Sequence, residues 1–205
     1  MRSPSPALVV LAMAFAWPAA AQETFEPCGE DPSGNTHAMI STLRAVAPGT
    51  EVLGVVETAA ATPSWGLRLV RDRTTTRLVR VAFDTGRWSQ AWRDAPGARF
   101  RKFDHGRGRA AATARSSPVD PGLARRLERL ARDAIAGAAP TMHFGADGSQ
   151  AYLVAGPARC VTVWTPAAAT RPGRIMALFR DLARYESAAS PDPARLDARL
   201  RLLGY

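Results

Sequence analysis

The N-terminal sequence constrains the compartment in which the rest of the chain folds. A positive start at Arg2 is followed by an almost unbroken apolar run from Ala7 to Trp17, then by Pro18 and three alanines. This order predicts a signal peptide over residues 1–21 that is removed on export. The alternative is a retained membrane anchor, but the apolar run is well short of the roughly 20 residues that a spanning helix needs. We therefore expect a periplasmic or secreted protein, with no transmembrane segment after cleavage.

Two cysteines, Cys28 and Cys160, remain after the leader. In an oxidising compartment, two lone thiols of one chain most often pair with each other. We expect a disulfide that ties the N-terminal segment to a distant strand. The alternative is a reactive or metal-binding thiol, and no other Cys or His lies at ligand spacing to support it.

Positive charge is concentrated in the middle of the chain. The net charge is +9, of which Arg2 in the leader supplies +1; the rest is −5 over residues 22–64, +9 over residues 65–115 and +4 over residues 116–205. Such an excess attracts nucleic acid, anionic lipid headgroups or acidic polysaccharide. Lys102 is the only lysine, and this bias toward arginine also fits a GC-rich coding sequence that scatters arginine over solvated surfaces. Both interpretations stay open.

Hydrophobic periodicity predicts alternating helical and extended segments. Asp120 can cap a helix that has Pro121 at its first position, and Asp147-Gly148 suits a tight hairpin turn. The predicted helices cover residues 36–47, residues 120–136, residues 175–186 and a short segment from Asp192. The predicted strands cover residues 52–56, 66–70, 77–83, 100–103, 109–115, 142–144, 151–155 and 160–164.

Strands that follow one another in local meanders, with helices between the groups, indicate an α+β fold rather than a wound parallel sheet. We predict antiparallel β-meanders with about four helices in a single domain, residues 22–205, with one disulfide. This domain has an acidic N-terminal segment over residues 22–64 and a basic, β-rich middle over residues 65–115. A part with helix, hairpin and helix follows over residues 120–205.

The C-terminal part carries a resemblance. Asp147-Gly148, Tyr152, a glycine turn, Trp164-Thr165-Pro166 and a helix with Leu178 and Leu182 follow one another over about forty residues. This order resembles a segment of small uncharacterised exported bacterial proteins. The resemblance implies an exported α+β protein; it implies no activity and assigns no functional residue.

The segment from Asp104 to Arg109 is the first candidate for ligand contact. Its glycines let the backbone approach an anion, and its arginines can hold phosphate or carboxylate in two hydrogen bonds. The alternative is a solvated hairpin loop, because neither a P-loop nor a dinucleotide fingerprint occurs. The predicted anion-binding residues are Arg101, Lys102, His105, Arg107 and Arg109.

Other chemistry has little support in the sequence. His37, His105 and His143 are far apart in the chain, so we expect no metal site and no cofactor. The G-x-S-x-G motif of serine hydrolases is absent, and we name no catalytic residue. Trp88 and Trp92, which have arginine neighbours, could stack on sugars or bases, but core packing is the more ordinary role of such residues.

These observations predict a non-catalytic binding or interaction module for an anionic partner. Candidate partners are an envelope polymer, a lipid headgroup or an acidic protein, and no motif is specific for nucleic acid. The basic surface that would face the partner takes in the predicted anion-binding residues and the strand arginines Arg68, Arg71, Arg77 and Arg80. The alternative is a cell-envelope hydrolase with dispersed catalytic residues, in which His105 and Asp104 would be the first candidates.

Overall fold

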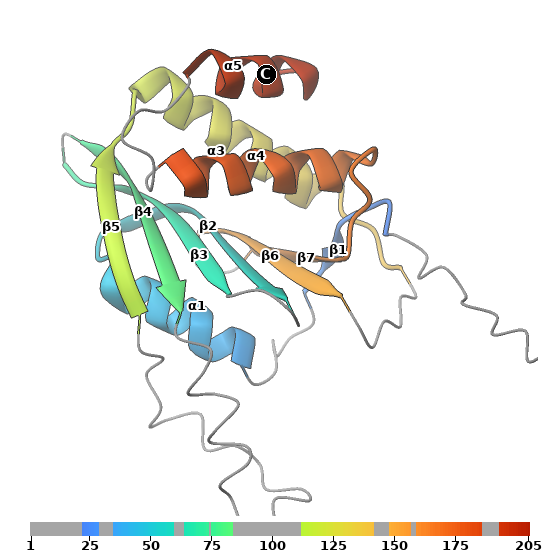
Figure 1. Ribbon diagram of the computed structural model, residues 1–205, viewed down its shortest axis with the longest axis horizontal. Coiled ribbons are helices and arrows are strands. Elements are labelled where there is room, and N and C mark those ends of the chain that lie inside the picture. The colour runs from blue at the N-terminus through green and yellow to red at the C-terminus, as the bar shows by residue number, and fades with distance from the viewer. Residues whose placement is uncertain are drawn as a thin grey trace, which may run out of the picture.

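The computed structural model describes residues 22–28, 35–59, 64–73, 75–83, 112–141, 148–156, 159–185 and 193–205. Figure 1 shows their arrangement and gives the labels used below. The strands are β1 (Glu26–Pro27), β2 (Thr50–Ala59), β3 (Trp65–Arg71), β4 (Thr76–Phe83), β5 (Ala112–Pro118), β6 (Ser149–Ala155) and β7 (Arg159–Trp164). The helices are α1 (Asn35–Val46), α3 (Pro121–Ala136), α4 (Arg171–Tyr185) and α5 (Pro193–Leu202).

The strands form one antiparallel sheet in the order β1-β7-β6-β2-β3-β4-β5. The predicted α+β fold is confirmed, including its hairpins β3–β4 and β6–β7. The predicted strands over residues 100–103 and 142–144 lie outside the described residues. The predicted strand over residues 109–115 is found as β5, shifted toward the C-terminus so that it ends at Pro118.

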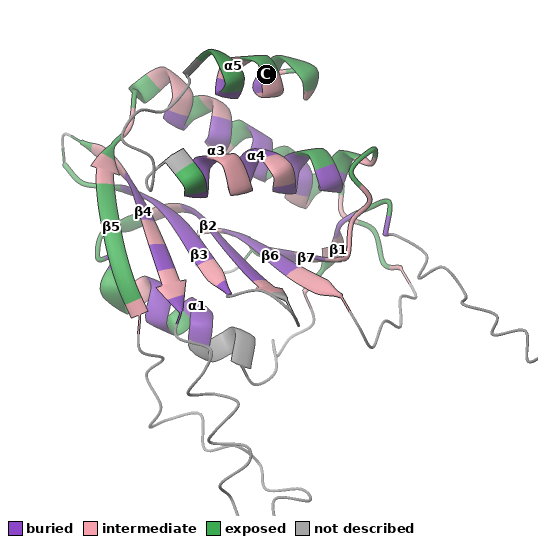
Figure 2. Cartoon of the chain, viewed as in Figure 1, coloured by how far each residue is buried: buried purple, intermediate pink, exposed green. Residues whose placement is uncertain are grey.

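Helices cover both faces of this sheet. The helix α1 lies on one face, whereas α3 and α4 lie on the other with α5 beside them (Figures 1 and 2). We call these the α1 face and the α3–α4 face. The larger core packs strand residues such as Leu67 and Leu78 against α3, α4 and α5, and the smaller core packs Val79 and Val81 against α1. Because side chains alternate along a strand, this assigns the face of every residue of β4.

The start of α3 follows the predicted signal. The carboxylate of Asp120 accepts a hydrogen bond from the Leu123 amide at 2.9 Å, and Pro121 occupies the first position. Leu127 and Leu130 then face the sheet and are fully buried. A cap, a proline and an apolar stripe together are sufficient to specify this helix.

The start of α4 corrects the sequence prediction, which began this helix at Ile175. The helix begins four residues before the predicted Ile175, because the Thr170 hydroxyl accepts a hydrogen bond from the Gly173 amide at 3.1 Å. A Cβ at Gly173 would lie 1.9 Å from the Ala167 carbonyl oxygen, so only glycine fits there. The sequence contains this signal as Thr170 followed by Pro172.

The predicted disulfide between Cys28 and Cys160 is confirmed. It joins the chain just after β1 to β7, where the Cys28 amide also donates to the Cys160 carbonyl at 3.1 Å. In β1, Glu26 pairs with Thr162. The bond therefore lies inside a hydrogen-bonded ladder and fixes the edge of the sheet.

The helix α5 packs Leu196 and Leu200 into the larger core and is also held by ion pairs. Asp197 accepts from Arg126 of α3 at 2.6 Å, which holds the pKa of this carboxyl below its usual range. The C-terminal Tyr205 donates its hydroxyl hydrogen to Asp133 of α3. Burial, followed by this hydrogen bond, raises the pKa of Tyr205 above its usual value. Among the described residues, no helix is long and apolar enough to cross a membrane.

Candidate binding site

The predicted anion-binding segment lies outside the described residues. This applies to Arg101, Lys102, His105, Arg107 and Arg109, and equally to Asp104, Trp88 and Trp92. His143 is also outside, and the His37 side chain is not described. The structure therefore leaves these candidates as predictions, and the site must be built from the arginines that it does describe.

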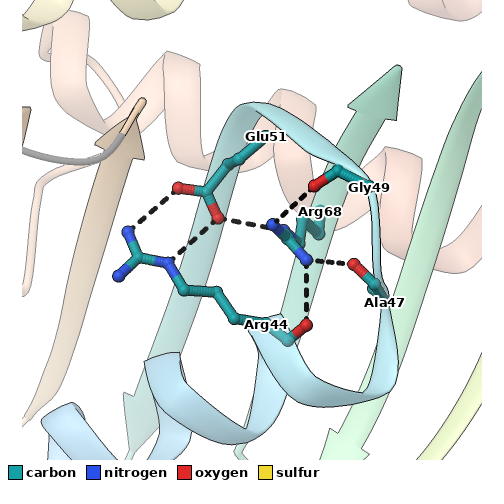
Figure 3. A network of polar contacts seen from close by, with 5 residues as sticks. All are labelled: Arg44, Ala47, Gly49, Glu51 and Arg68. Atoms are coloured by element: carbon teal, nitrogen blue, oxygen red, sulfur yellow. Dashed lines mark hydrogen bonds and ion pairs between the residues drawn. The ribbon is translucent and has the colours of Figure 1, made fainter. Parts of the chain in front are cut away.

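Arg68 does not belong to a basic surface, which corrects the sequence interpretation. Its side chain is 5% exposed on the α1 face. The guanidinium donates to the Glu51 carboxylate at 2.9 Å and to three main-chain carbonyls at the end of α1, those of Arg44, Ala47 and Gly49 (Figure 3). It therefore closes the C-terminus of α1, where carbonyls lack helical partners, and the carboxylate neutralises its charge.

The predicted strand arginines Arg71, which is exposed, and Arg77, which is half-buried, lie on opposite faces of the sheet. Arg71 reaches α3 on its face and pairs with Glu128 at 3.2 Å. Arg77 alternates with Leu78 and therefore projects from the α1 face, where it pairs with Asp72 at 2.9 Å. Alternation along the strands therefore divides the described arginines of β3 and β4 between the two faces of the sheet.

Arginines do gather on the outer side of α3. Arg125, Arg129 and Arg132 are exposed at spacings of four and three residues, so they form one row along the helix. Glu128 lies beside this row and also binds Arg71 from β3. Asp133 lies four residues after Arg129 on the same side of the helix, so Arg71, Arg125, Arg129 and Arg132 with these two carboxylates leave a local net charge of +2. We call the four arginines the α3 arginine surface.

A buried ion pair joins the sheet to α4. The Glu57 side chain is 7% exposed and holds Arg180 through both carboxylate oxygens. Hydrogen bonding to Glu57 raises the pKa of Arg180 against the opposing effect of burial. The carboxylate is fully engaged, so this pair is part of the fold and offers no free charge to a ligand.

A cavity of about 330 Å³ opens between the end of β4–β5 and the three helices of the α3–α4 face. Its size lies at the small end of the range for ligand pockets. Two carboxylates, Asp120 and Asp197, lie on its helical side together with Arg126, which is paired with Asp197. The rest of the lining is apolar: Leu78, Pro118, Val119, Leu123, Leu182 and Leu196.

Next to this cavity, two arginines stand directly opposite each other on β4 and β5. Arg80 pairs in register with Arg115, and both project from the α3–α4 face. Arg115 is exposed, whereas Arg80 is half-buried and its Nε atom is fully buried without a hydrogen bond. Like charges directly opposite in a sheet are destabilising, and a buried donor without a partner is costly. Among the described residues, no carboxylate forms an ion pair with either arginine.

The sequence predicts Arg80 as part of a general basic surface and does not distinguish Arg115 from other arginines. A signal for the pair was present, since each arginine lies at an alternating position of a predicted strand. Their register could not be read from it, because β4 and β5 are separated by a long connection. Among the described residues, no group of three His, Cys, Asp or Glu side chains could hold a metal ion.

Comparison of the chain with protein families, with curated proteins and with solved structures finds no match. Evidence for function therefore comes from the charges and the cavity of the molecule itself.

Proposed function

We propose that this protein is an exported, non-catalytic binding module for an anionic partner. The observation that carries the proposal is the α3 arginine surface. Among the described residues, Arg125, Arg129 and Arg132 form no ion pair, because the neighbouring Glu128 binds Arg71 and the neighbouring Asp133 accepts a hydrogen bond from Tyr205. A row of uncompensated, exposed arginines is the electrostatic footprint of a surface that meets negative charge.

The shape of the surface favours an extended partner. Arg125 and Arg132 are seven residues apart on one helix, which is about 10 Å along its axis. Charges spread along a line match the repeated charges of an acidic polymer better than they match one compact ion. We therefore take an anionic envelope polymer as the partner, and an acidic protein or lipid headgroups as outcomes of the test.

Export is part of the same proposal. The disulfide supports it, because such bonds persist in oxidising compartments and are rare in the cytosol. The predicted leader over residues 1–21 is the second support. Mass spectrometry of the protein from its native host should find an N-terminus close to Gln22. An intact Met1 would contradict cleavage.

Binding to heparin tests the partner class, since heparin is a linear polyanion. We expect the affinity to fall steeply with salt, because each arginine that contacts the polymer releases bound counterions. The variant R129Q/R132Q should weaken binding at low salt and make the dependence of log affinity on log salt shallower by up to about 2.

A matched control distinguishes a dedicated surface from net charge. The variant R174Q/R184Q removes the same charge from two exposed positions of α4. If both double variants weaken heparin binding equally, net charge alone explains the affinity and the assigned surface is wrong. If the protein does not bind heparin at low salt, the polymer is excluded, and titration with anionic vesicles and with an acidic protein identifies the alternative outcomes.

A further inference from the structure

We infer that the cavity and the Arg80–Arg115 pair form one binding site for a small amphipathic anion, an apolar chain with a single acidic head group. This site is separate from the α3 arginine surface and does not depend on the proposed polymer binding. Two features of the molecule are explained neither by the fold nor by the ion-pair network. One is an open apolar cavity, and the other is a pair of opposed arginines without a counter-charge among the described residues.

The two features are neighbours. Leu78 forms part of the cavity wall, and Arg80 is the next residue but one on the same strand and the same face. Alternate residues of a strand lie about 7 Å apart. Across the strand pair, Ser117 stands opposite Leu78 and Arg115 opposite Arg80. A ligand that fills the cavity and extends along β4–β5 therefore reaches both guanidinium groups.

The charges around the cavity set the direction of the ligand. On the helical side, Asp120 and Asp197 carry negative charge, and Arg126 is already paired with Asp197. These carboxylates repel an acidic group. At the strand side, Arg80 offers a buried Nε donor that has no acceptor. The acidic head must therefore lie over β4–β5, with the apolar chain among Leu123, Leu182 and Leu196.

The ligand class follows from size and charge. A volume of about 330 Å³ holds on the order of ten non-hydrogen atoms, taking about 30 Å³ for each. Two opposed arginines match the two oxygens of one carboxylate, or those of a sulfate or phosphate ester. The site fits a chain of about eight carbons with one such head, and binding would satisfy the buried donor and separate the like charges.

Isothermal titration with octanoate tests this site directly. Octylamine keeps the chain and reverses the charge, octanol removes the charge, and acetate keeps the head without the chain. We expect octanoate to bind at least about tenfold more tightly than each of the three, because the hydrogen bonds to charged groups and the apolar burial are both needed. Equal binding of octanoate and octylamine would overturn the inference.

Variants locate the site. R80M removes the buried donor while it keeps an unbranched apolar side chain, and L123W fills the cavity from α3. Each should reduce octanoate affinity at least about tenfold. Circular dichroism and thermal unfolding establish that each variant is folded, and R115Q at the exposed position serves as the variant least able to disturb the core. If octanoate affinity survives all three changes, the ligand binds elsewhere and the inference is wrong.

One further variant separates the two proposals. R129Q/R132Q, which alters the α3 arginine surface, should leave octanoate affinity unchanged while it weakens heparin binding. Conversely, R80M should leave heparin binding close to that of the unchanged protein. A loss of octanoate binding in R129Q/R132Q would show that general positive charge, and not the opposed pair, attracts the anion.

Discussion

Breaking the disulfide gives the sharpest test of how this fold is stabilised. Cys28 and Cys160 are 132 residues apart, so the bond closes most of the chain behind β1 into one loop. In the chain-entropy model, a loop of this length lowers the entropy of the unfolded chain by an amount worth about 5 kcal/mol at 25 °C. Residual compactness of the unfolded chain reduces this number, and we expect a loss of about 3–5 kcal/mol.

The measurement is urea unfolding of the oxidised protein and of C28A/C160A at the same pH. Because domains of this size are stable by only about 5–15 kcal/mol, the expected loss is a large part of the total. The oxidised protein treated with a phosphine reductant serves as a control that keeps both sulfur atoms. It should unfold at a urea concentration close to that of the double variant.

Local detachment of β1 is the competing explanation for any loss, since this strand has only two residues. Cleavage by chymotrypsin after Phe25 measures it, because Phe25 is buried and its carbonyl is hydrogen-bonded to the Ala139 amide while β1 pairs with β7. Rapid cleavage of C28A/C160A together with an unchanged urea midpoint would show that the bond fixes only the sheet edge. A loss of less than about 1 kcal/mol would refute the loop-entropy argument for this protein.

Three further changes test the charged interactions and the cap. R68M should destabilise the protein by about 3 kcal/mol in urea unfolding, because the carbonyls at the end of α1 lose their donor and the buried Glu51 carboxylate keeps only Arg44 as a partner; a loss below 1 kcal/mol would contradict this. E57Q should cost about 1.5 kcal/mol by the same measurement, since Arg180 loses a charge-assisted pair but can still reach water. D120A should lower the stability by about 1 kcal/mol and D120N by only a few tenths, because asparagine also caps helices well; equal losses would argue against the cap.

The pH dependence of α5 follows from the Asp197 carboxyl, whose pKa in the folded protein is below its unfolded value of about 3.9. The stability that this group adds is therefore present above about pH 4 and is lost as the pH falls through the lower, folded value. Amide hydrogen exchange in α5 should become faster relative to α3 as the pH is taken from 6 to 3, after correction for the intrinsic rate. The variant D197N should show fast exchange already at pH 6, and unchanged protection in that variant would exclude the ion pair as the latch.

Local patterns in the sequence predicted most elements of this fold. The β3–β4 hairpin followed from alternation, and α3 followed from Asp120, Pro121 and its leucine stripe. The disulfide followed from two lone cysteines behind a predicted leader. The hairpin and the helix are determined by residues close together in the sequence, and two cysteines allow only one intramolecular pair. These features can therefore be predicted without the tertiary structure.

Whether an individual arginine is paired with a carboxylate could not be predicted from local sequence patterns. Arg68 and Arg80 occupy similar alternating positions in adjacent strands, yet one is neutralised and the other is not. The difference depends on a register shift in β2 between Glu51 and Leu53. Such a bulge moves the preceding side chain to the other face, so Glu51 points to the α1 face and meets Arg68. No pattern close to Arg68 in the sequence predicts that Glu51 is its partner.

The position of each charged side chain relative to the helices that cover the sheet explains which charges remain unpaired. Arg68, which lies under α1, is paired with Glu51, and Glu57, which lies under α4, is paired with Arg180 of that helix. A charge that a helix encloses must be paired. Beyond these helices, over β4–β5, Arg80 is enclosed enough to bury its Nε atom but has no carboxylate among the described residues. Scattering of arginine by codon bias accounts for exposed positions, where an unpaired charge is solvated at little cost. It does not account for a half-buried arginine opposite a second one, and that position is therefore where selection for an anionic ligand should be sought.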